Sequence, residues 1–85
     1  MSDTSKLREV ADHHQAEALE RSKIARSRYI MAEKAEAAGD TRGAREYRAM
    51  GDAERKVAAS QQAEADRLRT MADVYDEMPV APAKT

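Results

Sequence analysis

The chain has 85 residues, a formal net charge of -1 and no cysteine. This length allows one domain and leaves little room for a deep catalytic cleft, and the absence of cysteine excludes disulfides, thiolate metal sites and a cysteine nucleophile. The nearly neutral charge provides no general attraction to nucleic acid or anionic lipid, so an electrostatic partner has to be recognised by a local patch.

The sequence shows neither a targeting segment nor a membrane span. Residues 1–6 are polar and lack the apolar core of a signal peptide. No segment approaches the roughly 20 apolar residues that a membrane-spanning helix needs. We therefore expect a protein without a membrane partner, located in the cytoplasm, or inside the virion if a phage encodes it.

The first predicted element is a long helix over residues 5–38. This segment contains no glycine or proline, and its apolar residues recur three and four positions apart. We expect Thr4 or Ser5 to cap its amino end, because a hydroxyl oxygen can accept a hydrogen bond from a free backbone N–H. Glu9 lies near that end, where the helix dipole favours a carboxylate.

A turn at residues 39–41 ends this helix. Gly39 is the residue expected just after a helix, where a positive φ carries no steric penalty, and Asp40 or Thr41 can cap the next helix. Residues 39–47 resemble the inter-helix turn of tetratricopeptide-type hairpins in the offsets of their small and aromatic residues. The resemblance is confined to this segment and implies a helical hairpin without implying a function.

The second predicted element is a helix over residues 42–77. Pro79 ends it, because the residue before a proline is driven out of helical geometry, and residues 79–85 form a flexible tail. We expect the helix to continue through Gly51 at a cost of about 1 kcal/mol. The alternative is a break at Gly51 with Asp52 as a new cap, which would give three helices.

The two helices are expected to pack as a long antiparallel hairpin, an all-α fold that resembles a coiled coil and occupies residues 1–78. The expected contact face of the first helix comprises Leu7, Val10, Ala11, His14, Ala18, Ala25, Tyr29 and Ala32, widened by Ile24, Met31 and Ala35. The matching stripe on the second helix comprises Met50, Val57, Leu68, Met71, Tyr75 and Met78, with Ala53, Ala65 and Ala72 beside it. The sequence predicts that these stripes form the seam.

Polar residues interrupt the middle of the predicted seam. Folding the chain at the turn places Arg28 near Glu54. It also brings Arg21 near Gln61 or Glu64. We interpret this pairing as a device that fixes the register, because a shifted pairing would leave a partly buried charge without a partner.

The predicted seam is thin because alanine supplies many of its positions. A large buried side chain contributes about 1.5–3 kcal/mol, and alanine contributes less. A lone hairpin would be marginally stable. Leu19 and Ile30 lie on the opposite side of the first helix and are candidates for binding a second surface, although single exposed leucines and isoleucines are common. We therefore expect self-association as a homo-oligomeric bundle, or docking on a protein partner.

The residue types give little support to catalysis, a cofactor or a metal. Ser22, Ser27 and Ser60 lie inside predicted helices without an oxyanion turn. His13 and His14 have acidic neighbours within one turn, but the second helix has no histidine to complete a di-metal set. We expect no enzyme activity, no cofactor and no small-molecule substrate. A metal site formed by identical helices of an oligomer is the alternative.

A band of basic residues lies at the middle of the predicted rod. Its members are Arg21, Lys23, Arg26 and Arg28 on the first helix, and Arg55 and Lys56 on the second. Such a band could bind the phosphate backbone of a structured nucleic acid, or an acidic protein surface. Two observations argue against nucleic acid. Neighbouring carboxylates can pair with these basic side chains, and the band contains no aromatic residue that could stack on a nucleobase.

These observations predict a small non-enzymatic helical interaction protein with a structural, assembly or regulatory role, such as that of an adaptor or inhibitor. The candidate partner-binding residues are Leu19, Ile30, Arg21, Lys23, Arg26, Arg28, Arg55 and Lys56. The alternative is a nucleic-acid-binding hairpin dimer that uses the basic band.

Overall fold

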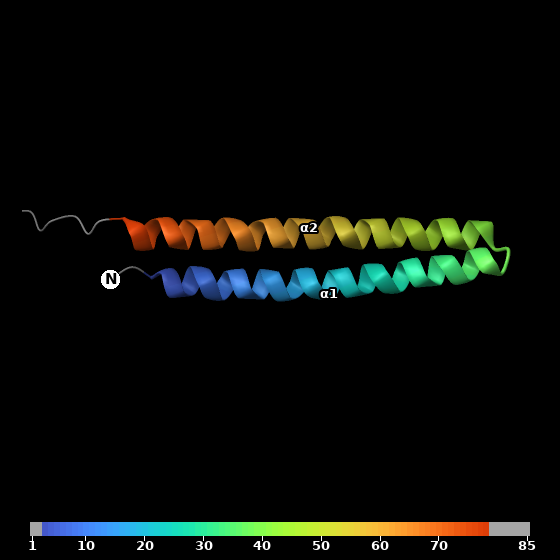
Figure 1. The fold of residues 1–85 in the computed structure, drawn as a ribbon, viewed down its shortest axis with the longest axis horizontal. Helices are drawn as coiled ribbons and strands as arrows, with labels where there is room; N and C mark the ends of the chain where they lie inside the picture. Colours follow the sequence, from blue (N-terminus) through green and yellow to red (C-terminus); the bar gives the residue numbers. More distant parts are fainter. Residues whose placement is uncertain (1–2, 79–85) are drawn as a thin grey trace, which may run out of the picture.

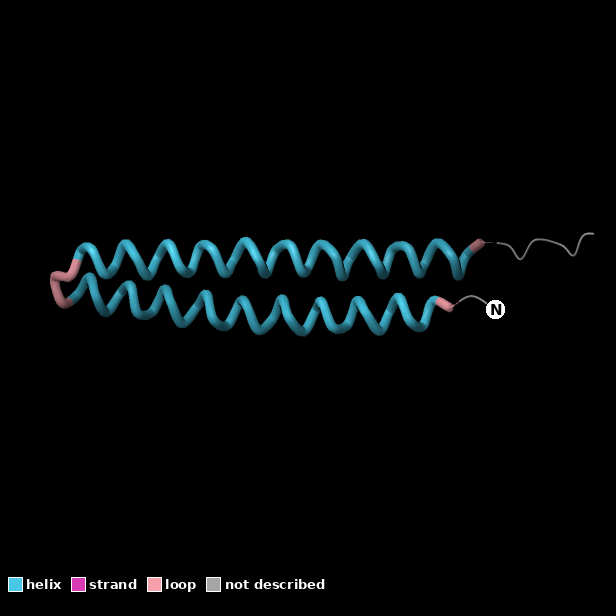
Figure 2. The backbone as a smooth tube through the Cα atoms, turned by 180° about the vertical axis from the view of Figure 1, so that it is seen from behind, coloured by secondary structure: helices cyan, strands magenta, loops and turns pink. Residues whose placement is uncertain are grey.

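Two long helices lie side by side in opposite directions (Figure 1). The computed structural model describes residues 3–78, which form α1 (Thr4–Ala37) and α2 (Thr41–Glu77). The view from behind shows the same pair joined by a short turn, with the start of α1 and the end of α2 at the other end of the rod (Figure 2). The hairpin measures 59 × 12 × 11 Å. The predicted all-α antiparallel hairpin is confirmed.

The helix bounds agree with the predicted ones to within one residue, and α2 continues through Gly51 without a break. The predicted tail, residues 79–85, lies outside the described residues. The predicted cap of α1 is wrong, because Asp3 occupies the cap position and Thr4 is already helical. The Thr4 hydroxyl instead donates a hydrogen bond of 2.8 Å to Oδ1 of Asp76, which ties the beginning of α1 to the end of α2.

The turn follows from the local chemistry of its residues. Gly39 has a φ of 81°, a left-handed conformation that glycine adopts without strain. The N–H of Gly39 donates to the carbonyl of Glu36 at 3.0 Å, and the N–H of the next residue donates to Ala35 at 2.8 Å. The carboxylate of Asp40 caps α2 by accepting from the N–H of Gly43 at 2.9 Å. The predicted turn and its Asp40 cap are confirmed.

The seam between the helices is a row of small residues spaced seven apart. This buried row comprises Thr4, Ala11, Ala18, Ala25 and Ala32 on α1, and Ala44, Gly51, Ala58, Ala65 and Ala72 on α2. A seven-residue spacing keeps one side of a helix turned toward its partner over many turns. Small side chains let the backbones approach toward the lower end of the roughly 8–10 Å range of helix packing. Within residues 3–78, no large side chain is fully buried.

The predicted seam is therefore wrong in part. Leu68 and the alanines at positions 11, 18, 25, 32, 65 and 72 are buried as predicted, but Val10 and Met31 are 45% and 37% exposed. The exposed members of the predicted stripe on α2 are Met50, Val57, Tyr75, Met78 and Ala53. The physical reason is size, because a large side chain between the backbones would hold the helices apart and lose the contacts of the buried row.

Gly51 makes room for the ring of Tyr29 on the other helix. A Cβ atom at position 51 would lie 2.7 Å from Cε1 of Tyr29, which is closer than packed carbon atoms tolerate. The Tyr29 hydroxyl donates a hydrogen bond of 2.5 Å to Oδ1 of Asp52. The contact with Tyr29 across the seam therefore explains why position 51, although inside a helix, is a glycine.

Replacing Gly51 with alanine tests this contact. At an open helical site, Gly→Ala stabilises a protein by about 1 kcal/mol. Here the added methyl group displaces the Tyr29 ring, so we expect the gain to be lost. In a Tyr29→Ala background the space is free, and Gly51→Ala should stabilise. Urea unfolding of the wild type, the two single variants and the double variant should give a coupling energy of about 1 kcal/mol or more. An equal effect in both backgrounds would contradict the contact.

A second prediction concerns the size of the seam. Ala58→Leu should destabilise the hairpin by about 1–3 kcal/mol, because the larger side chain pushes the backbones apart. Ala63→Leu is the matched control, since Ala63 is exposed on the same helix and its change should stay within about 0.5 kcal/mol. Thermal unfolding followed by circular dichroism measures both. Stabilisation by Ala58→Leu would show that the seam accommodates large side chains.

Candidate interaction face

Two hydrogen-bonded pairs mark one lateral side of the hairpin. His14 donates from Nδ1 to Oε1 of Gln61 at 2.5 Å. Arg21 donates to Oε2 of Glu54 at 3.2 Å. Each of these four residues follows a member of the buried row by three positions, so equivalent positions of both helices lie on the same side of the seam.

Most large apolar side chains of the hairpin belong to this side. We define the apolar face as the residues three and six positions after each member of the buried row, since residues three apart are neighbours on a helix surface. Its large apolar members are Leu7, Val10, Ile24, Met31, Tyr47, Met50, Val57, Leu68, Met71, Tyr75 and Met78. Leu7 and Tyr75 line one shallow pocket, as expected if both helices contribute to one face.

Much of the apolar face is open to solvent. Within residues 3–78, nine large apolar residues are exposed, and the six that belong to the face are Val10, Met31, Met50, Val57, Tyr75 and Met78. The exposed fractions of Met50 and Met78 are 48% and 56%. Single exposed apolar residues are ordinary, whereas six of the nine lie on this one face.

Polar residues occupy the middle of the apolar face. They are His14, Glu17, Arg21, Arg28, Glu54, Gln61 and Glu64. The Arg21 guanidinium lies 3.2 Å from Glu54 and 2.9 Å from Glu17, and these hydrogen bonds, the one to Glu54 first, raise the pKa of Arg21. The predicted pairing of Glu54 with Arg28 is wrong. The pairs His14–Gln61 and Arg21–Glu54 follow one register, in which Arg28 lies seven residues further along α1, at the level of Tyr47.

The opposite side of the hairpin carries ion pairs. Arg8 contacts Asp73 at 2.9 Å and Asp76 at 2.6 Å. Hydrogen bonds to these carboxylates, the one to Asp76 first, raise the pKa of Arg8. Arg69 contacts Asp12 at 2.9 Å. Exposed pairs of this kind add little stability, so their main effect is to favour the correct register.

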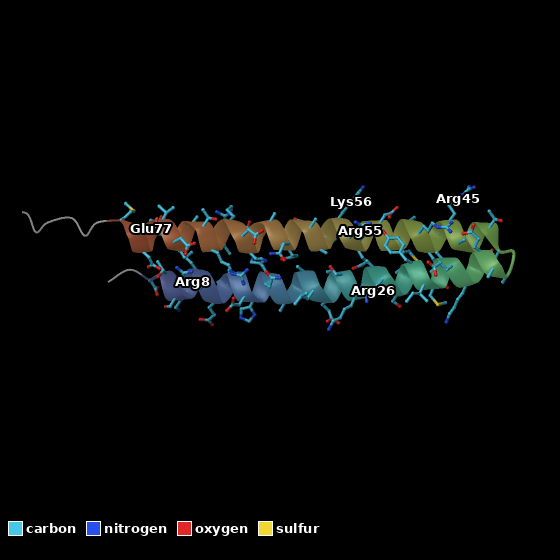
Figure 3. The ribbon with its side chains drawn as sticks, viewed as in Figure 1. Arg8, Arg26, Arg45, Arg55, Lys56 and Glu77 are labelled. Carbon is cyan, nitrogen blue, oxygen red and sulfur yellow. The ribbon has the colours of Figure 1, made fainter. Side chains whose placement is uncertain are left out.

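The predicted basic band does not gather on one side of the rod. Arg21 and Arg28 belong to the apolar face. Arg26 and Arg55 line a shallow groove on the opposite side. Lys56 extends from α2 away from α1 (Figure 3). The band therefore surrounds the rod and presents only part of its charge in any one direction.

The remaining predicted contact residues lie outside the apolar face. Leu19 and Ile30 are 57% and 46% exposed. Leu19 lines a shallow groove with Lys23, and Ile30 lines a neighbouring one. The apolar face itself was missed in the sequence analysis. The signal that could have revealed it is the seven-residue spacing of the small residues, from which the positions of the face follow.

Within residues 3–78, no group of three His, Asp or Glu side chains could hold a metal ion. None of the described helices has an apolar stretch long enough to cross a membrane. Comparisons with models of protein families, with curated proteins and with solved structures gave no match.

Titration of the tyrosines tests the contact between Tyr29 and Asp52. The hydrogen bond to Asp52, followed by partial burial, raises the pKa of Tyr29, and Arg55 opposes this shift. Because the folded-state pKa is raised, the stabilisation is present below the unfolded-state pKa of about 10 and is lost as pH rises through the folded-state value. Tyr29→Phe should remove the Tyr29 step from the ultraviolet titration, and Asp52→Ala should move that step to lower pH.

Proposed function

We propose that this chain is a small non-enzymatic interaction protein that binds another protein through its apolar face, in a structural, assembly or regulatory role such as that of an adaptor or inhibitor. The observation that carries the proposal is the series of large apolar side chains beside the seam. The hairpin uses alanine and glycine for its own helix contact. Its larger apolar side chains remain available to a partner.

The shape of the apolar face limits the partner that it fits. Each helix is about 50 Å long, so the face is a straight strip and not a pocket for a small molecule. A partner made of helices with a matching apolar stripe fits such a strip. The charges in the middle of the face require complementary charges on the partner. A location in the cytoplasm, or in a virion, is part of this proposal.

Nucleic-acid binding through the basic band is the alternative, and it has less support. The six basic residues surround the rod, and the Arg21 guanidinium already forms ion pairs with two carboxylates. A phosphate backbone would contact only part of this ring. Binding of duplex RNA that weakens steeply with salt and with charge reversal at Arg26, Arg55 and Lys56 would favour the alternative.

Photocrosslinking in the cells that make the protein tests the proposal. Val57, which is 41% exposed on the apolar face, is replaced by the photoreactive p-benzoylphenylalanine. We expect a strong protein adduct from position 57, because the face is covered by a partner. The matched control is position 63, where Ala63 is exposed on α2 outside the face, and it should give little adduct. Mass spectrometry identifies the protein and the residue that are joined.

Two outcomes would contradict this proposal. The first is the lack of any adduct from position 57, or adducts of equal strength from positions 57 and 63. The second is a strong adduct from position 19 without one from position 57, which would move the binding surface to the side of α1 that carries Leu19.

A further inference from the structure

We propose that the partner on the apolar face is a second copy of this chain, so that two hairpins form a four-helix bundle. This inference rests on the proposed function and names its partner. In the bundle the two apolar faces lie against each other, both turns are at the same end, and α1 of each copy packs on α2 of the other.

The dimensions of the face suit a hairpin as the occupant. The two helices are about 50 Å long and together about 20 Å wide, so the face offers a contact surface of about 1,000 Å². A stable interface between two proteins covers roughly 800 Å² on each partner. A single helix would cover about half of the width and leave a row of large apolar residues open. A second hairpin covers both helices.

The order of residues along the face matches that of a second copy. Leu7 and Tyr75 lie at the open end, and Met31 and Met50 lie near the turn. The polar residues lie between these two apolar groups, with Ile24 and Val57 among them. When two copies overlap fully, apolar groups meet apolar groups and the polar middles meet each other. The charged side chains are thereby kept away from the apolar groups of the partner.

The distribution of charge selects which helices pack on each other. In the middle of α1, Arg21 and Arg28 outweigh Glu17, since two positive charges and one negative charge give +1. In the middle of α2, Glu54 and Glu64 together give -2. Packing α1 on α2 of the other copy places opposite charges together, which favours association.

The reversed arrangement, with the turns at opposite ends, packs each helix on its own counterpart. Arg21 lies near the middle of α1, so it would face the same arginine of the other copy. Glu54 and Glu64 lie at equal distances from the middle of α2 and would face each other. Like charges opposite one another disfavour this arrangement, so the arrangement with both turns at one end is the better one.

The bundle also enlarges the small core of the single hairpin. Leu68 is the one large residue among 3–78 that is buried, and Leu7 packs partly buried against it and the neighbouring alanines. Ile24, Tyr47 and Met71 are half-buried beside the seam. A second apolar face would remove the remaining surface of these side chains from water, which contributes about 25 cal/mol for each Å² of apolar area.

Sedimentation equilibrium of the purified chain tests the association. We expect twice the monomer mass of 9.4 kDa, and a melting temperature that rises with protein concentration. Val57→Glu should raise the dissociation constant by at least about tenfold, because it buries a charge in the interface. Val74→Glu is the matched control. Val74 is an exposed valine of α2 outside the face, and its replacement should leave the dissociation constant unchanged within about twofold.

Spin labels at the turn test the arrangement of the two copies. The chain has no cysteine, so Ala38→Cys provides a single labelling site just beyond α1. With both turns at one end, the labels should lie within about 30 Å of each other, since a four-helix bundle is about 20–25 Å across. A distance of about 50 Å or more, the length of the rod, would overturn the arrangement.

The outcomes separate this inference from the proposed function. A wild-type chain that sediments as a monomer at all concentrations overturns the inference, and so do equal effects of Val57→Glu and Val74→Glu. If position 57 then forms an adduct with a foreign protein in cells, the proposed function stands without self-association. If position 57 forms no adduct and the chain is monomeric, both are overturned. The concentration dependence of the wild-type melting temperature requires no variant and therefore applies even if Val57→Glu fails to fold.

Discussion

The close approach of two helices along a row of small residues is the constraint on which the rest of this structure depends. Small residues every seven positions, alanine or glycine except for Thr4 at the start of α1, leave little side-chain bulk between the backbones and allow the helices to pack closely. Gly51 shows how tight the fit is, because even one methyl group at that position would overlap the ring of Tyr29. The seam therefore specifies the geometry of the hairpin, although it buries little apolar volume.

This geometry determines where every larger side chain lies. Once the backbones are close, a methionine or valine next to the row cannot insert between them and has to lie beside the seam. Polar side chains on that side bridge the helices instead, as His14 does with Gln61. The same constraint thus produces both a thin core and a strip of apolar residues that a partner can cover. In a larger protein these side chains would form the core; here they form a surface.

The sequence predicted the parts of the fold that depend on local chemistry. Gly39 and Asp40 specify the turn through a positive φ and a side-chain cap, and both act within a few residues. The seam depends on which of two neighbouring stripes faces the partner helix. The alanines of α1 and Leu68 are buried as predicted, but the large residues of the predicted stripe on α2 are mostly exposed, because small residues fill the contact. The partner of Glu54 also depends on the register of the two helices, since the pairs His14–Gln61 and Arg21–Glu54 leave Arg28 seven residues away.

In the proposed interaction, the polar middle of the apolar face gives the contact its selectivity. An entirely apolar strip would bind any apolar helix, because burial of apolar area has no directional requirement. Arg21 and Glu54 already form a pair within one hairpin. A partner that lacks charges at the same level would remove water from both side chains without offering new hydrogen bonds, and this desolvation is unfavourable. A partner with the complementary charges avoids that cost, and its position along the rod is then fixed. Placing the charges at mid-length makes a displacement of the partner in either direction unfavourable, since each displacement brings an apolar group over a charge.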